Sequence, residues 1–146
     1  IVILGVLSAF ALPRFADLGR EARIAALQGL EGAMRSAAAI TYSACQSAPT
    51  CDPSESPNNQ EANNAISLEG ASVTLAYGYP RATPNGILNA AQIDGADYQL
   101  VNQSTTTEDI ALSPAGLSDP STCELRYTQP SAQGESPTIA LTTAGC

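Results

Sequence analysis

The chain opens with an uninterrupted apolar stretch, IVILGVLSAFAL, and this stretch limits the fold more than any other feature of the sequence. Residues 1–12 contain no ionisable side chain, and Ser8 carries their only hydroxyl. As an α-helix the stretch spans about 18 Å, less than the ~30 Å hydrocarbon core of a bilayer. Because it begins abruptly, without Met or charged residues, we expect that it was originally longer. The alternative at this length is a helix buried in a protein core.

The helical pattern continues beyond the apolar stretch and becomes amphipathic. Two successive sets of apolar and small residues fall at helical spacing: Ala11, Phe15, Leu18 and Ala22, followed by Leu27, Leu30, Met34, Ala37 and Thr41. Charged residues fill the other side, where Glu31 and Arg35 form a favourable i,i+4 pair. We expect the helix to end near Cys45, which gives a rod of about 65 Å.

The rest of the chain is too small to cover such a rod. We therefore predict a protruding apolar helix over residues 1–22 and a globular head over residues 23–146. A protruding apolar helix is insoluble unless it enters lipid or a bundle of its own kind. Gly5 and Pro13 weaken helical structure, so we expect a kink or local unwinding between them. The predicted helix–helix interface comprises Ile1, Val2, Ile3, Leu4, Val6, Leu7, Phe10, Ala11, Leu12 and Phe15.

Beyond the helix the sequence predicts an antiparallel sheet, and hence an α+β fold. Residues 46–65 form a polar loop rich in Pro, Asn and Ser. Alternating apolar residues predict strands at 73–77, 98–102, 108–112, 123–127 and 139–141. Residues 84–93 favour a short helix with Thr83 as its cap. The strands are joined by turns rather than long helices, which favours antiparallel pairing.

Composition excludes most enzyme classes. The chain contains neither His nor Lys, so it lacks the usual general base, the usual metal-binding imidazole and a Schiff-base amine. We expect no catalytic residue, no cofactor and no metal. The net charge is −8, and the only cations of the head beyond the helix are Arg81 and Arg126. Direct binding of nucleic acid is therefore not expected.

Four cysteines in a small, turn-rich chain indicate an oxidising compartment. Three disulfide pairings are possible, and we favour Cys45–Cys51 with Cys123–Cys146. The first closes a short loop where the helix ends, and the second ties the last residue to a strand. A metal site would need close cysteine pairs or His partners, and the sequence has neither.

Two further patterns carry both a functional and a simple structural interpretation. Residues 94–97 (DGAD) place two carboxylates close enough to hold Ca²⁺, but an EF-hand needs more carboxylates, so an ordinary turn is the favoured interpretation. Asn102 begins the sequence Asn-Gln-Ser, a candidate N-glycosylation site; the alternative is a solvated loop.

The motifs along the chain resemble type IV pilins. An apolar run with an internal Gly precedes ALPRFADLGREARIAALQGLEGAMRSAA, and YGYP followed by AT and GI stands at residues 77–87. The segment CELRYT lies ahead of the terminal Gly-Cys. Together these motifs look closest to the mannose-sensitive haemagglutinin class of type IVa pilins. The resemblance covers residues 1–39, 77–87 and 123–146 and does not extend to residues 46–65 or 100–120.

The resemblance implies a subunit made at the inner membrane, cleaved and methylated at its new N-terminus, and assembled by pilus machinery into a homo-oligomeric helical filament. Family filaments often unwind the helix between the Gly and the Pro, here Gly5 and Pro13. Family pilins also begin with Phe and carry a Glu in the second helical turn. Neither lies in this sequence, and we expect about nine residues upstream of Ile1, enough for a membrane-crossing length.

These observations predict the major subunit of an extracellular, cell-surface type IV pilus that serves adhesion, attachment or motility. Three alternatives stay open. A type II secretion pseudopilin shares the helix, but the major ones use a calcium site instead of the terminal disulfide that Cys123 and Cys146 suggest. A minor pilin shares the whole pattern. A membrane-anchored binding module predicts a monomer with an apolar pocket in its head.

Overall fold

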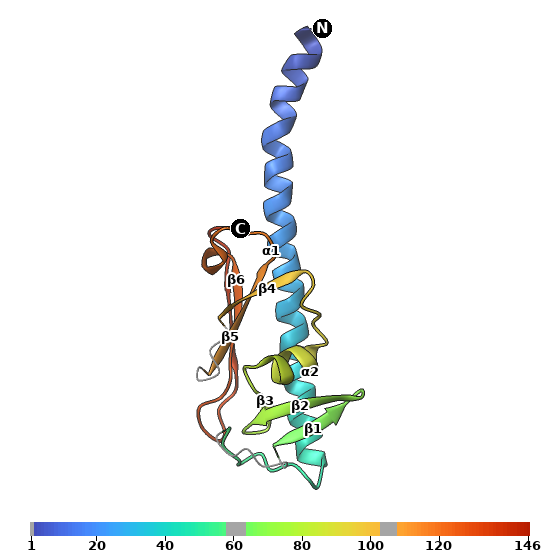
Figure 1. Cartoon of the computed structure of the whole chain (residues 1–146), viewed down its shortest axis with the longest axis vertical. Helices are drawn as coiled ribbons and strands as arrows, with labels where there is room; N and C mark the ends of the chain where they lie inside the picture. Colours follow the sequence, from blue (N-terminus) through green and yellow to red (C-terminus); the bar gives the residue numbers. More distant parts are fainter. Residues whose placement is uncertain (1, 58–63, 103–107) are drawn as a thin grey trace.

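The structure is a computed structural model that describes residues 2–57, 64–102 and 108–146. For residues 2–18 and for Asn102 it describes the backbone only. Helix α1 (Val2–Ser47) forms a long rod, and the remaining elements gather around its C-terminal half (Figure 1). At 1.5 Å per residue its 46 residues extend about 70 Å. The architecture is the pilin-like α+β fold that the sequence predicts: a long N-terminal helix packed against antiparallel sheets.

In its described residues the head contains seven strands, two short helical segments and one helical turn. In chain order they are β1 (Ala65–Leu68), β2 (Ala71–Ala76), β3 (Tyr79–Pro80), η1 (Pro84–Leu88), α2 (Asn89–Ala91), β4 (Tyr98–Asn102), β5 (Asp109–Pro114), η2 (Pro120–Thr122), β6 (Glu124–Thr128) and β7 (Thr138–Thr142). The strands form two sheets, with the orders β1-β2-β3 and β4-β5-β6-β7. These pairings are antiparallel, as the short connections predict.

Several boundaries differ from the sequence-based expectation. The sequence does not predict strand β1, because a four-residue segment with little apolar alternation gives a weak signal. Tyr77, expected at the end of a strand, lies in the two-residue turn between β2 and β3. Thr83 precedes η1 in an extended conformation but makes no side-chain capping bond. The predicted short helix is divided into a π-helical segment and a single α-turn.

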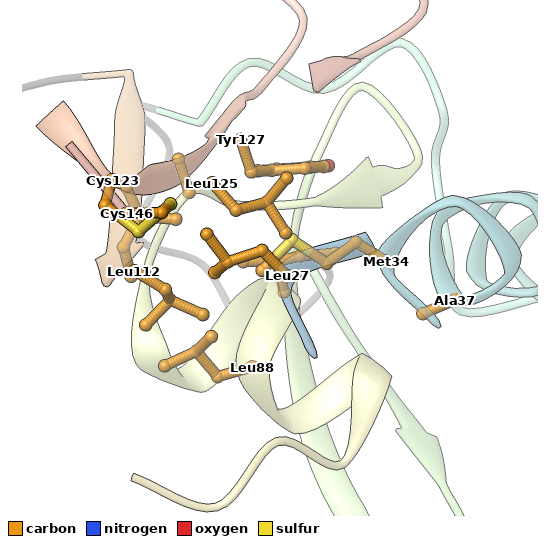
Figure 2. Packing of buried hydrophobic residues seen from close by; sticks show 12 residues of the cluster. Leu27, Met34, Ala37, Leu88, Leu112, Cys123, Leu125, Tyr127 and Cys146 are labelled. Atoms are coloured by element: carbon orange, nitrogen blue, oxygen red, sulfur yellow. A yellow bond between two sulfur atoms is a disulfide. The ribbon is translucent and has the colours of Figure 1, made fainter. Parts of the chain in front are cut away.

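The core lies between α1 and the inner face of the four-stranded sheet (Figure 2). Leu27 and Met34 of α1 are completely buried, as are Leu125 and Tyr127 of β6. Together with Ala37 and Thr41, which are also buried, Leu27 and Met34 form the buried face that the helical spacing predicts. Cys45 of α1 enters a second, smaller cluster with Ile66, Val73 and Leu75 under the three-stranded sheet.

Candidate functional site

The N-terminal half of α1 projects beyond the head, with no other described element beside it (Figure 1). This half carries the residues that we predict to form a helix–helix interface. The side chains of residues 1–18 lie outside the description, so their contacts stay predictions. Helix α1 runs without interruption through Gly5 and Pro13, and unwinding of this segment in an assembled filament also stays a prediction. Within the residues that the structure describes, no helix is apolar over a length that would cross a membrane.

The C-terminal half of α1 is anchored in the head by burial of one face. Leu27, Met34 and Thr41 are each fully buried, and Ala37 is nearly so. Figure 2 shows Leu27 and Met34 directed toward Leu125 and Tyr127 of β6. Because each buried Leu or Met contributes about 1.5–3 kcal/mol relative to exposure, this face alone holds the rod firmly in the head.

A second anchorage lies where α1 leaves the head. The guanidinium of Arg23 donates a 2.7 Å hydrogen bond to the carbonyl oxygen of Cys146. Arg20 donates a 3.3 Å bond to the carbonyl of Thr143. Both arginines come from α1 and both acceptors from the C-terminal segment. This segment therefore connects the base of the projecting helix to the four-stranded sheet.

The C-terminal segment is itself tied to the sheet by a disulfide. Cys123 is bonded to Cys146, with 4.8 Å between their Cα atoms, and both residues are buried. Gly145 packs so closely on η2 that a Cβ there would lie 1.8 Å from Oγ1 of Thr122. Only glycine fits this position in the present packing, which explains why the final Cys is preceded by Gly.

The opposite end of α1 is tied by the second disulfide. Cys45 is bonded to Cys51, with 5.2 Å between their Cα atoms. The structure thus contains both disulfide pairings expected from the sequence, and it has no free cysteine among the described residues. The bond holds the loop that follows α1 against the small cluster under β1 and β2.

The outward face of α1 is polar or small-chained along the head. The predicted pair of Glu31 and Arg35 forms at 2.7 Å. Ile40 departs from this pattern, with 60% of its surface exposed. Beside it lies a shallow groove between α1, the β1–β2 hairpin and α2.

The remaining candidate sites give no ligand geometry. No group of three potential metal ligands occurs in the described part of the chain, and Asp94 and Asp97 lie in an exposed, irregular segment before β4. Asn102 ends β4, but its side chain and residues 103–107 lie outside the description. Glycosylation there stays a prediction.

A charged network on the four-stranded sheet was not predicted from the sequence. Arg126 of β6 pairs with Asp109 and Glu124, and the Glu124 bond measures 2.7 Å. Partial burial acts to lower the pKa of Arg126, but the hydrogen bonds and charges of Glu124 and Asp109 together outweigh it and raise the pKa. Residues i and i+2 on one strand share a face, so the Glu124–Arg126 spacing was a usable signal. The pairing with Asp109 depends on strand register and gives no such local signal.

Comparison with known proteins relates the chain to a pilus component. It is 46% identical over 52 residues to the type IV narrow pilus major component PilA5 of Thermus thermophilus. The match covers 36% of this chain and 45% of that relative, so the chain spans less than half of the relative's length. No protein-family profile matches the chain, and no solved structure matches it. The homology, although distant, is to a structural protein and not to an enzyme.

Proposed function

We propose that this chain is the major subunit of an extracellular type IV pilus, which assembles through its N-terminal helices and serves adhesion, surface attachment or motility. One observation carries the proposal: half of a 46-residue helix projects from the head, and its end is apolar and uncharged. Such a surface needs a partner that is equally apolar. The distant homology to a type IV pilus major component supports this interpretation.

In this proposal the interface residues are those of the apolar run, and Gly5 and Pro13 permit local unwinding during packing. Before assembly the subunit is held in the inner membrane, from which the pilus assembly machinery extracts it. The acidic head faces solvent. Its two disulfides suit an oxidising, extracellular location because small secreted domains commonly rely on such bonds.

The arrangement also explains why the base of the helix is tied so strongly. A force applied along the filament passes from α1 into the head. The Arg20 and Arg23 bonds join α1 to the C-terminal segment, and the Cys123–Cys146 bond joins that segment to the sheet. Force is therefore distributed over the core and this second connection.

The test is electron microscopy of material sheared from cells that express the full-length gene, with mass spectrometry of the recovered subunit. We expect thin filaments built of this chain. The variant Val6→Arg places a charge in the apolar run and should abolish filaments while the subunit accumulates in the membrane fraction. Ala96→Arg, at an exposed position of the head, is the matched control and should assemble.

Other outcomes would favour the alternatives. Short fibres confined to the periplasm would indicate a pseudopilin, and filaments in which this chain is a trace component would indicate a minor pilin. A protein that stays in the membrane without fibres would indicate an anchored binding module. Normal filaments from Val6→Arg would contradict the proposed interface.

A further inference from the structure

A small cavity of about 150 Å³ opens at the end of the head where α1 finishes. Four separate parts of the chain form it: α1, the loop after it, the β2–β3 turn and the β6–β7 connection. The lining side chains include Tyr42, Pro53, Tyr77, Tyr79, Gln133 and Glu135. Three of the chain's five tyrosines thus meet in one place, which is unexpected for a head with so few aromatic residues.

Two of these rings pack face to face on one another. The rings of Tyr42 and Tyr79 are stacked, with centroids 4.4 Å apart and an interplanar angle of 13°. Tyr42 and Pro53 also pack closely on Gly78, where a Cβ would lie 3.0 Å from Cδ2 of Tyr42 and 3.1 Å from Cβ of Pro53. The Cys45–Cys51 bond holds the start of the loop that brings Pro53 to the cavity.

The third ring comes from a residue in an unfavourable conformation. Tyr77 has φ +51° and Gly78 has φ +83°, as a two-residue type I′ hairpin requires. Asn or Asp is the preferred first residue of such a turn, since their short side chains tolerate the left-handed region. A bulky aromatic residue is poorly suited to this position, and such local departures concentrate at functional sites. In this conformation the side chain of Tyr77 lines the cavity.

The described lining of the cavity carries one formal charge, which is negative and solvent-exposed. Glu135 is the one carboxylate among its described lining residues, and Oε2 accepts hydrogen bonds from the backbone N–H (3.2 Å) and hydroxyl (2.7 Å) of Ser131. These bonds lower the pKa of Glu135, so the carboxylate is ionised at neutral pH. No cationic side chain lines the cavity within the described part of the head. Arg35 lies in a neighbouring hollow beside Tyr79, where it pairs with Glu31.

We propose that this tyrosine cavity binds an alkylammonium group, with a quaternary ammonium as its best ligand. The negative faces of aromatic rings attract cations, and sites lined by such rings are the usual receptors for quaternary ammonium groups. Here three tyrosines and one carboxylate line the cavity. The volume is below the ~300 Å³ at which drug-sized ligand sites begin, so it suits one cationic head group. The site is separate from the projecting helix and does not depend on assembly.

The experiment titrates the full chain in uncharged maltoside micelles with tetramethylammonium chloride. Because the chain contains no Trp, its intrinsic fluorescence reports on tyrosine alone. Sodium chloride at matched ionic strength is the reference titration. We expect a saturable change with a dissociation constant on the order of 1–10 mM, typical of a small single-group ligand. A response indistinguishable from that of sodium chloride would overturn the proposal.

Variants separate binding from folding. Tyr77→Asn removes one ring but installs a residue that the turn prefers, so thermal stability should be kept or raised while affinity falls at least about tenfold. Glu135→Gln keeps the side-chain shape and should weaken binding roughly fivefold through the lost charge. Tyr98→Phe, which lies outside the cavity, should bind as the parent does. Unchanged affinity in Tyr77→Asn would contradict the assignment.

Two larger probes identify the source of the group. Phosphocholine carries a trimethylammonium next to a phosphate, as in a lipid headgroup, whereas N-acetyl-trimethyllysine amide carries the same cation on a protein-like stem. Stronger binding of phosphocholine would indicate a lipid source. Stronger binding of the lysine derivative would indicate a protein partner, and failure of both to compete with tetramethylammonium would contradict the proposal.

Discussion

The phenol hydroxyl of Tyr127 donates a 2.8 Å hydrogen bond to the carbonyl oxygen of Pro80. The ring is completely buried, and the two residues lie on β6 and β3, which belong to different sheets. A second buried hydrogen bond lies two residues further along both segments: the backbone N–H of Ala82 donates a 2.9 Å bond to Oε1 of the buried Gln129. The two sheets are therefore joined by buried polar contacts as well as by the helix that both cover.

Tyr127→Phe tests this connection. The substitution keeps the ring but leaves the Pro80 carbonyl without its partner, which costs about 1–3 kcal/mol for a buried group. We expect a loss of that size in the free energy of unfolding, measured by urea denaturation of the full chain in maltoside micelles. Tyr98→Phe is the control, because no hydrogen bond of the Tyr98 hydroxyl occurs among the described residues. Equal losses in the two variants would contradict the prediction.

The same residue predicts a response to alkaline pH. Burial raises the pKa of Tyr127 far above its ordinary value of 10.0, and the nearby Tyr79 adds to the rise. The unfolded chain therefore loses this proton at lower pH than the folded chain does. The contribution to stability is complete below about pH 10 and falls as the pH rises above it. Tyr127→Phe should show a smaller further loss between about pH 9 and 11; an identical slope would refute this cause.

The disulfides should differ in their contribution. Cys123 and Cys146 are 23 positions apart in sequence, whereas Cys45 and Cys51 are only six apart. Loop entropy predicts a loss of about 3 kcal/mol on replacing the first pair by Ser and about 2 kcal/mol for the second. Urea denaturation of both double variants measures the difference. A greater loss from the short loop would show that strain or contacts, rather than chain entropy, dominate.

Local periodicity was enough to predict several parts of the fold from the sequence. The spacing of Leu27, Met34 and Thr41 identified the buried face of α1, and all three are fully buried. The alternation of Leu125 and Tyr127 identified β6 in the same way. Each pattern reflects the repeat of one element, about 3.6 residues in a helix and two in a strand, so no knowledge of neighbours was needed.

The features that the sequence did not predict depend on which distant segments of the chain lie next to one another. Periodicity did not indicate that the strands divide into two sheets, because pairing partners are chosen by register and by turns. The hairpin at Glu69 and Gly70 allows β1 to pair with β2, but its short strand gives little signal. The tyrosine cavity was also missed. Its rings, taken one at a time, are typical packing residues, and they come together only because four distant segments converge.

Two glycines give opposite predictions for the same substitution. At Gly86 an added Cβ would lie 2.2 Å from the backbone oxygen of Arg81, a contact that only a backbone shift relieves. At Gly29, on an exposed part of α1, it would meet nothing within 4 Å. Gly29→Ala should therefore stabilise the chain by about 0.5–1 kcal/mol. Gly86→Ala should destabilise it by more than about 2 kcal/mol. Thermal unfolding of the pair is the measurement, and a gain from Gly86→Ala would contradict the packing.

Lowering the pH should reduce the stability of the folded head, because two exposed carboxylates become protonated. Hydrogen bonds from Ser54 lower the pKa of Asp52 below 3.8, and bonds from Ser131 lower that of Glu135 below 4.5. A lowered folded-state pKa means that the unfolded chain takes up protons first as the pH falls. This contribution to stability is thus present above about pH 4.5 and is lost progressively below it.

The thermal midpoint should fall between about pH 5 and 3. The variant Ser131→Ala should be less stable than the parent near pH 6 but equally stable near pH 3. Ser36→Ala, at an exposed helical position, controls for the loss of a hydroxyl. A Ser131→Ala deficit that is equally large at both pH values would mean that the hydroxyl acts on the loop without the charge of Glu135.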